Sequence, residues 1–126
     1  MSEHDGAALS AQIQQVFATD GALAEGDPHY RVREEQGVFA QAVGQALQQG
    51  SALVAEVGTG VGKTFAYLVP LLLSGKRALV STATKSLQDQ LYNRDLPRLL
   101  TALNAPVRTA LLKGRSSYLC LHRLKR

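Results

Sequence analysis

The sequence predicts an α/β domain with a mostly parallel sheet, because short apolar runs alternate with segments of helical periodicity. Three runs suit buried strands: residues 51–57, 77–82 and 107–112. A glycine-rich turn joins the first run to an apolar helix, and a strand, a turn and a helix in this order are typical of phosphate sites. With 126 residues and 45% hydrophobic content, the chain is long enough to bury one core.

The first 29 residues are expected to form a helix followed by a loop, ahead of a domain in residues 30–126. Residues 9–19 place apolar side chains on one side of a helix. These side chains are Leu9, Ile13, Val16 and Phe17. The next segment, DGALAEGDPH, is rich in Gly, Asp and Pro, which favours a loop.

Two longer helices are expected on either side of the first predicted strand. Apolar residues recur at helical spacing between positions 38 and 47, and Gly50 stands where a C-terminal cap belongs. The second helix should run from about residue 62 to residue 73 and end at Ser74 and Gly75. Pro70 lies inside this helix and is expected to kink it.

Three further helical segments are expected in the second half of the chain. Residues 85–93 and 96–103 should form two separate helices, with Asp95 as the N-cap of the second and Pro97 in its first turn. The final stretch, SSYLCLHRLKR, is predicted to begin another helix.

Charge is divided unevenly between the two halves of the chain. Residues 1–60 carry two Arg against eight Asp or Glu, a net charge of −6. Residues 61–126 carry twelve Lys or Arg against two Asp, a net charge of +10. Clustered cations indicate a polyanion partner, either nucleotide phosphates or a nucleic-acid backbone, and a solvated basic face without a partner is the alternative.

The sequence favours a soluble, cytoplasmic protein that does not insert into a membrane. Its longest apolar run, residues 65–73, is far shorter than the roughly 20 residues that cross a bilayer. The polar start MSEHDGAALSAQ lacks the basic and apolar regions of a signal peptide. A single cysteine, Cys120, cannot form an internal disulfide, which agrees with a reducing compartment.

The stretch AEVGTGVGKTFAYL predicts a phosphate-binding loop for a nucleoside triphosphate. Bare backbone lets amide groups point at phosphates, and the helix N-terminus adds partial positive charge. Lys63 would reach the β- and γ-phosphates, and the Thr64 hydroxyl would ligate Mg²⁺. The whole predicted loop comprises Gly58, Thr59, Gly60, Val61, Gly62, Lys63 and Thr64. Val57 replaces the first glycine of the usual pattern, and the alternative is a glycine-rich turn with a surface lysine.

Four blocks of sequence, in this order, carry a resemblance to a known family: YRVREEQGVFAQAV, LVAEVGTGVGKTFAYLVPLLL, LVSTATKSLQDQLYNRDLP and ALLKGRSSYLC. Over about residues 9–126 the chain resembles the N-terminal part of the DinG/YoaA group of DNA helicases, relatives of XPD in helicase superfamily 2. The resemblance implies part of a RecA-like P-loop NTPase domain. The parent enzyme would hydrolyse ATP with Mg²⁺, move along single-stranded DNA and serve in DNA repair.

The resemblance also implies roles for residues outside the loop. Arg33 and Gln36 stand where these helicases read adenine, since a glutamine amide can pair with the edge of the base and Arg33 could stack on it. Residues expected to contact the DNA are Thr82, Thr84, Lys85, Lys113 and Arg115. Tyr118 is a further candidate, for stacking on a base, and core packing is its alternative. For the others, the alternatives are solvated residues at a helix start or an ordinary capped helix.

In the resembling enzymes, a cysteine at the position of Cys120 is the first of four thiolates that hold a 4Fe-4S cluster. One cysteine cannot hold such a cluster, so Cys120 is expected to be a buried apolar thiol in this chain. The sequence also has no Asp-Glu pair after an apolar strand to orient the attacking water. We therefore expect a fragment that stops before the Walker B strand. Two other hypotheses are a non-helicase P-loop ATPase and a binding module without turnover.

Overall fold

The computed structural model describes residues 3–58, 60 and 62–125, and the regular structure in these residues is helical. The helices are α1 (Glu3–Val16), α2 (Ala22–Gly26), α3 (Glu34–Gln49), α4 (Lys63–Ser74), α5 (Lys85–Gln90), the π-helix η1 (Leu91–Asp95), α6 (Leu96–Leu103), the 3-10 helix η2 (Arg115–Ser117) and α7 (Leu121–Leu124).

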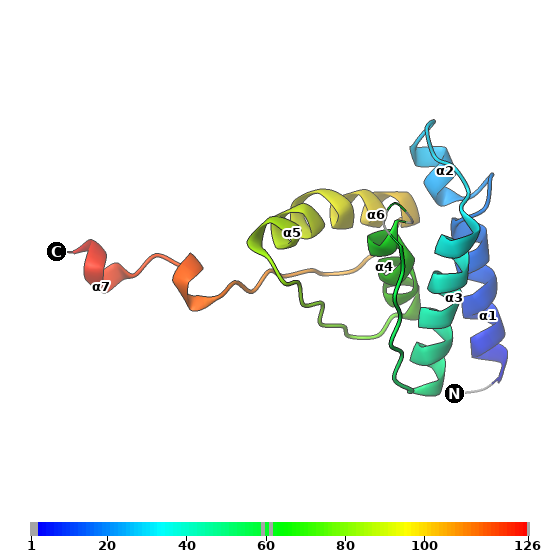
Figure 1. The fold of residues 1–126 in the computed structure, drawn as a ribbon, viewed down its shortest axis with the longest axis horizontal. Coiled ribbons are helices and arrows are strands. Elements are labelled where there is room, and N and C mark those ends of the chain that lie inside the picture. Colours follow the sequence, from blue (N-terminus) through cyan, green and yellow to red (C-terminus); the bar gives the residue numbers. More distant parts are fainter. Residues whose placement is uncertain (1–2, 59, 61, 126) are drawn as a thin grey trace.

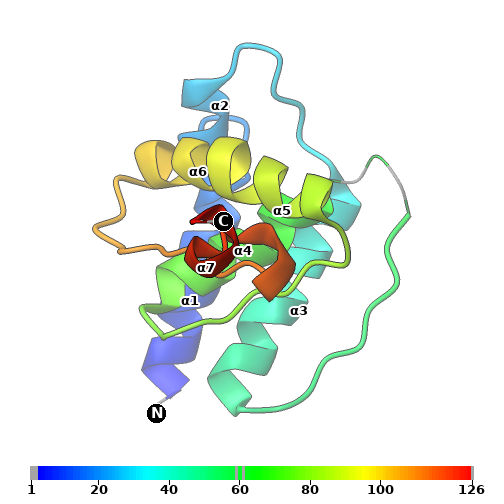
Figure 2. The same cartoon turned by 90° about the vertical axis from the view of Figure 1, so that its left-hand side faces the viewer.

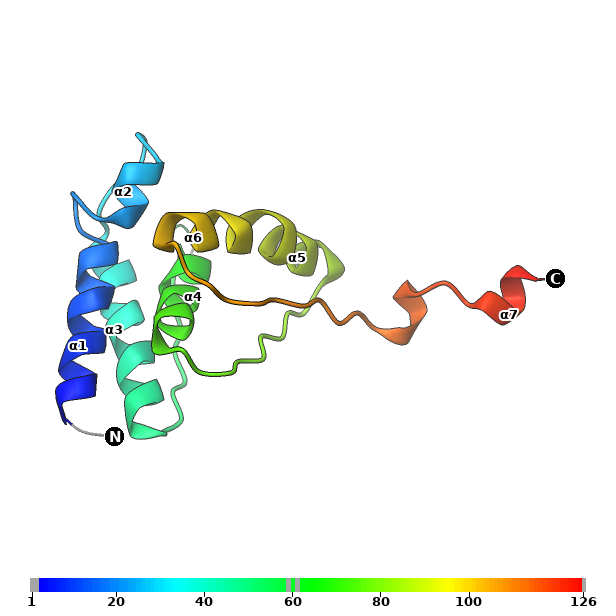
Figure 3. The ribbon, with the colours of Figure 1, turned by 180° about the vertical axis from the view of Figure 1, so that it is seen from behind.

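Helix α3 lies between α1 and α4, and the three helices run side by side (Figures 1 and 3). The continuous rod of α5, η1 and α6 crosses one end of this group (Figure 2). Apolar side chains from α1, α2, α3, α4 and α6 meet in one core. Its buried members are Leu9, Ile13, Val16, Phe17, Leu23, Ala40, Ala66, Leu68, Val69 and Leu99.

Helices α1 and α3 approach closely because Gly44 has no side chain. A Cβ atom at Gly44 would lie 2.6 Å from Cδ1 of the fully buried Ile13. Beside this contact, the Ser10 hydroxyl donates to Oε1 of Gln41, and Nε2 of Gln41 donates to the backbone oxygen of Ser10, both at 2.9 Å. The two helices are therefore fixed by apolar packing and by a reciprocal pair of hydrogen bonds.

The predicted ends of α3 and α4 are confirmed. Gly50 adopts φ 63° and donates its N–H to the carbonyl of Ala46, and Gly75 ends α4 with φ 69°. Both glycines take the left-handed conformation that side chains disfavour. Pro70 lies fully buried inside α4, whose assignment continues through it for four more residues.

Three local predictions are wrong. Helix α1 begins near the N-terminus and ends at Val16, three residues before the expected end, and the short helix α2 occupies part of the segment expected to be a loop. Asp95 is not an N-cap, because its own φ of −74° and ψ of −45° are helical and η1 joins α5 to α6 without a break. Its side chain is buried and pairs with Arg94 instead.

The predicted α/β fold with a mostly parallel sheet is also wrong for the part of the chain that the structure describes. Residues 51–57, 77–82 and 107–112 carry no strand assignment, and none of their described backbone hydrogen bonds joins two of these segments. Val54 and Leu79 are 99% and 92% exposed. Apolar β-branched sequence favours extended backbone, but a strand also needs a neighbour that completes its hydrogen bonds, and these segments lie apart.

The chain after α6 leads away from the helices, and η2 and α7 project beyond the rest of the molecule (Figures 1 and 3). Cys120, expected to be buried, is exposed in this segment, because no core element covers it. The predicted final helix is confirmed in part by the four residues of α7.

Candidate nucleotide and nucleic-acid site

The glycine loop leads directly into α4. Gly60 and Gly62 have φ values of 81° and 78°, and Gly62 is the N-cap of α4, with Lys63 and Thr64 as the first helical residues. Gly62 offers no side chain to cap the helix, so the first-turn amides are left without a capping side chain. These amides suit an anion. Thr59 and Val61, also predicted for the loop, lie outside the described residues.

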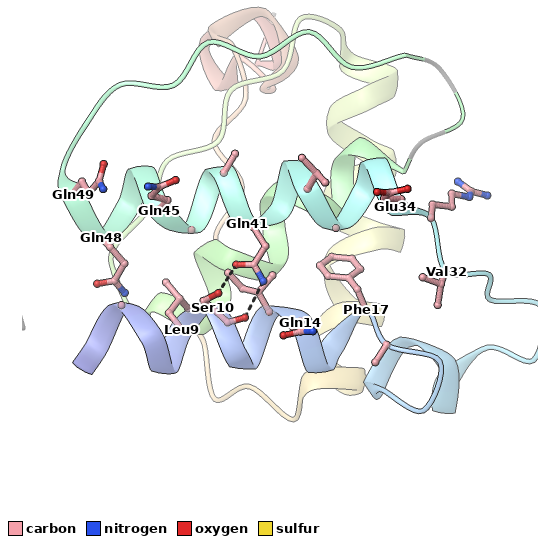
Figure 4. A pocket seen from close by; sticks show the side chains of 18 residues that line it. Leu9, Ser10, Gln14, Phe17, Val32, Glu34, Gln41, Gln45, Gln48 and Gln49 are labelled. Carbon is pink, nitrogen blue, oxygen red and sulfur yellow. Dashed lines mark hydrogen bonds between the residues drawn. The ribbon is translucent and has the colours of Figure 1, made fainter. Parts of the chain in front are cut away.

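The start of α3 holds this loop through two side chains far away in sequence. Nη1 of Arg33 donates to the carbonyl of Gly60, and Nε2 of Gln36 donates to the carbonyl of Gly62 at 3.0 Å. The segment 51–58 makes these contacts possible, because it returns alongside α3 from the helix's C-terminal end to its N-terminal end (Figure 4). The structure thus brings the predicted adenine-reading residues and the predicted phosphate loop together.

The contact between α3 and the loop requires glycine at position 62. A Cβ atom there would lie 2.3 Å from Nε2 of Gln36, and φ 78° is strained for any residue with a side chain. The carbonyl of Gly62 also accepts the N–H of Ala66 at 3.2 Å. Gln36 is 4% exposed, and its amide retains an oxygen and a second hydrogen beyond the bond to Gly62.

Lys63 and Thr64 differ in their surroundings. Lys63 is exposed, whereas Thr64 is half-buried, one helical turn before Tyr67 on α4. The pKa of Tyr67 is raised above its ordinary value, mainly by burial of the hydroxyl. The Thr64 hydroxyl opposes this increase, and the carboxylate of Asp95 adds to it. Neutral tyrosine is therefore the stable form beside Thr64. The single hydroxyl of Thr64 suits Mg²⁺, because this ion takes most of its ligands from phosphates and water.

The predicted DNA-contacting residues lie around the start of α5. Thr84 is the N-cap of α5, and its hydroxyl oxygen accepts the N–H of Leu87 at 3.1 Å. The Thr82 hydroxyl donates to the carbonyl of Thr84 at 3.4 Å, and Lys85 is exposed as the first residue of the helix. A capped helix end with an adjacent ammonium can bind a phosphate, although Thr84 oxygen already has a backbone partner.

Lys113 and Arg115 lie on the segment that follows α6. Gln88 of α5 donates from Nε2 to the carbonyl of Leu112 at 3.1 Å, which places this segment next to α5. The N–H of Lys113 donates to the hydroxyl of Tyr118 at 2.8 Å, and the Tyr118 ring is 52% exposed. Tyr118 is therefore not a core residue, and Arg115 is fully on the surface.

Sequence reasoning missed two polar residues beside the loop helix. Asp95 was expected only as a cap, and Tyr67 was not singled out at all. In the structure Asp95 is 6% exposed on η1, which contacts α4. Its carboxylate contributes to the raised pKa of Tyr67. Their signal in the sequence is a tyrosine one helical turn after the loop threonine and an aspartate between two apolar helical segments.

An open groove of about 1210 Å³ lies between α1 and α3 (Figure 4). Leu9 and Phe17 line its apolar floor, and glutamines from both helices line its sides. Of the two side chains that hold the glycine loop, only Arg33 lines this groove. Apart from Arg33, the predicted site residues therefore lie outside this groove.

The described residues contain no cluster of three or more His, Cys, Asp or Glu that could hold a metal ion. A 4Fe-4S cluster needs about four thiolates, and Cys120 is the one cysteine in the sequence, so the residues of this chain do not fit such a cluster. Within the described part of the chain, no helix has the length and apolar character to cross a membrane.

A glycine loop that caps a helix and is held by an arginine and a glutamine from a neighbouring helix makes the chain a candidate P-loop nucleotide-binding protein. Residues 38–125 match the DEAD/DEAH box helicase family, and the chain belongs to this family. No solved structure matches the chain significantly.

Relatives in several bacteria agree with this family. The chain is 54% identical over 113 residues to the ATP-dependent DNA helicase YoaA of Haemophilus influenzae, covering 90% of this chain and 18% of the relative. It is 47% identical over 100 residues to the ATP-dependent helicase DinG of Mycobacterium tuberculosis, covering 73% and 15%. It is 35% identical over 108 residues to the 3'-5' exonuclease DinG of Bacillus subtilis, covering 82% and 12%. The chain thus spans less than a fifth of the length of these relatives.

Proposed function

We propose that this chain is the N-terminal, ATP-binding portion of an ATP-dependent DNA helicase that works in the cytoplasm. Residues 30–126 provide the nucleotide-binding part, and hydrolysis is coupled to movement along single-stranded DNA in the whole protein. The observation that carries the proposal is the pair of hydrogen bonds from Arg33 and Gln36 to the loop carbonyls of Gly60 and Gly62. These bonds support the proposal, because they hold the two side chains proposed to contact the base next to the loop proposed to bind the phosphates.

Each residue of the site has a distinct role in this proposal. The first-turn amides of α4 and the Lys63 ammonium bind the phosphates, while Gln36 pairs with adenine and Arg33 stacks on it. Thr64 supplies a hydroxyl for Mg²⁺, which, when bound, neutralises charge that develops on the phosphates. Thr82, Thr84, Lys85, Lys113 and Arg115 bind the phosphate backbone of single-stranded DNA.

For the chain alone, we propose nucleotide binding without turnover. The specific observation is that the sequence contains no Asp-Glu pair to orient the attacking water. Family membership argues against a P-loop ATPase outside the helicases. A phosphate-release assay with oligo(dT) should therefore give no stimulated turnover.

The test of the proposal is equilibrium binding of a fluorescent ATP analogue to Lys63→Ala. Hydrogen bonds to charged groups contribute about 1.5 to 3 kcal/mol, so the variant should bind roughly 10- to 100-fold more weakly. Lys125→Ala removes an equal charge from an exposed position on the projecting C-terminal segment, and it should bind like the unmodified chain. Equal affinities for the two variants would remove Lys63 from the site.

A further inference from the structure

Two side chains hold the two polar ends of a single peptide group in the segment that follows α6. Nε2 of Gln88, on α5, donates to the carbonyl of Leu112 at 3.1 Å. The N–H of Lys113 donates to the hydroxyl of Tyr118 at 2.8 Å. The carbonyl of one residue and the N–H of the next belong to the same planar unit. The 112–113 peptide group is therefore held from both sides, by one residue of α5 and by one residue further along the chain.

A 3-10 turn brings Tyr118 back to this peptide group. The N–H of Ser117 donates to the carbonyl of Gly114 at 2.9 Å, and the N–H of Tyr118 donates to the carbonyl of Arg115 at 3.3 Å. Helix η2 therefore folds the chain back, so that the Tyr118 hydroxyl reaches the backbone five residues earlier. Residues 113–118 form a closed loop, and Arg115 lies within it.

Burial does not require these two hydrogen bonds. Leu112 is 80% exposed, and the segment passes α5 before it projects from the molecule (Figures 1 and 3). Water can satisfy both polar groups of an exposed peptide unit, so the backbone does not need two side chains as partners. The hydrogen bonds instead give an exposed segment one fixed position against α5.

This fixed position brings cations from two segments together. Lys85 and Gln88 are three positions apart on α5, the spacing at which side chains are neighbours on one helix face. Because Gln88 holds the peptide group of Lys113, Lys113 lies at the same face as Lys85, and Arg115 follows in the closed loop. Neither of the ion pairs in the described part of the chain involves these three cations.

A cationic surface built from two segments suits an extended polyanion. Asp89 is the one acidic residue of α5, so the three cations outnumber the carboxylate beside them. Cations that lie on both sides of a junction can contact successive phosphates, because phosphate contacts follow the backbone of a nucleic acid. A segment that is already ordered also loses less conformational freedom on binding, which strengthens the affinity.

We propose that Gln88 and Tyr118 are positioning residues: they hold the 112–113 peptide group so that Lys113 and Arg115 lie beside Lys85 and both segments bind successive phosphates of one DNA strand. This inference rests on the proposed function, to which it adds two residues. It also gives Tyr118 a role for its hydroxyl in place of base stacking by its ring.

The experiment measures the Kd of fluorescently labelled oligo(dT) by anisotropy for the unmodified chain, Tyr118→Phe and Gln88→Met. Each variant should bind about 2- to 10-fold more weakly, the range that loss of one neutral hydrogen bond allows. The matched controls are Tyr92→Phe and Gln90→Met, which lose the same polar groups at other positions of the α5 and η1 rod and should bind like the unmodified chain. Tyr118→Phe keeps the ring, so a role in base stacking alone predicts no change for it.

A second comparison separates positioning from a general effect on the fold. In a chain that carries Lys113→Ala and Arg115→Ala, Tyr118→Phe should weaken binding no further, because the cations that it positions are gone. A residue that only stabilises the fold would weaken binding equally in both backgrounds. The slope of log affinity against log salt should fall in magnitude by about 1.4 in the double alanine variant, since each phosphate contact on a single strand contributes about 0.7.

The outcomes distinguish this inference from the proposed function. Unchanged affinity in either Tyr118→Phe or Gln88→Met, or equal losses from Tyr118→Phe in the two backgrounds, would overturn the inference while DNA binding itself stands. Failure of the unmodified chain to bind oligo(dT) would refute the proposed DNA contacts, and the inference with them. If Tyr118→Phe does not fold, which circular dichroism reports, Gln88→Met decides the question.

Discussion

Alanine at Gly62 should destabilise the chain more than alanine at Gly50 or Gly58, two glycines that have no partner from α3. The left-handed conformation costs a residue with a side chain about 1 to 2 kcal/mol. The smaller conformational freedom of the unfolded alanine chain offsets about 0.4 to 1 kcal/mol of this. In addition, the new Cβ would lie 2.3 Å from Nε2 of Gln36, which removes a hydrogen bond that contributes roughly 0.5 to 1.5 kcal/mol.

Two other glycines separate these contributions. Gly50 has φ 63° and nothing within 4 Å of an added Cβ, so Gly50→Ala carries the conformational cost alone, a net loss of roughly 0.5 to 1 kcal/mol. Gly58 has neither a positive φ nor a close neighbour, so the unfolded-chain contribution acts alone and Gly58→Ala should stabilise the chain by about 0.4 to 1 kcal/mol. Gly62→Ala should lose about 1 to 2.5 kcal/mol in total.

The assay is urea unfolding of the three variants followed by circular dichroism at the helical band, with midpoints and slopes compared. A loss in Gly62→Ala that equals the loss in Gly50→Ala would refute the contact between Gln36 and the loop. No loss of stability in Gly62→Ala, the result expected for Gly58→Ala, would refute the left-handed conformation as well.

Three further predictions concern the scaffold around the site. Gly44→Ala should destabilise the chain by about 1 to 2 kcal/mol, because the new Cβ would meet Cδ1 of Ile13. Ile13→Val lacks this atom, so the double variant should lose less stability in urea unfolding than the sum of the two single variants. Thr84→Ala should cost about 1 kcal/mol of thermal stability through loss of the α5 cap, whereas Thr84→Ser should retain the cap and the stability. Burial raises the pKa of Tyr30 above 10.0, and Arg33 opposes this shift. The stabilisation from neutral Tyr30 should be fully present below pH 10 and be lost as the pH rises further, because the tyrosine of the unfolded chain loses its proton first. Tyr30→Phe should therefore make the loss of stability above pH 10 less steep when the free energy of unfolding is measured against pH.

Local sequence signals predicted local structure well. Gly50 and Gly75 marked helix ends, and the glycine loop was placed correctly before α4, because capping and left-handed backbone depend on a few neighbouring residues. The sheet could not be predicted in this way. Residues 51–57 and 77–82 have the composition of strands, but pairing depends on what lies beside them in space.

The site was predictable in its parts and not in its contacts. Family resemblance singled out Arg33 and Gln36, while their hydrogen bonds to loop carbonyls depend on the return of the chain along α3. Asp95 shows the limit most clearly. Its position shortly before Pro97 is typical of an N-cap, but a π-turn instead leaves it inside a continuous helix with its side chain buried.

A nitrogen-15 NMR titration of the chain with Mg²⁺ and a non-hydrolysable ATP analogue would show whether the glycine loop and the start of α3 form one nucleotide site. The largest shifts should occur in the backbone amides of Gly62, Lys63 and Thr64 and in the side-chain amide of Gln36. Shifts confined to the groove between α1 and α3, or no saturable shifts at all, would contradict the claim.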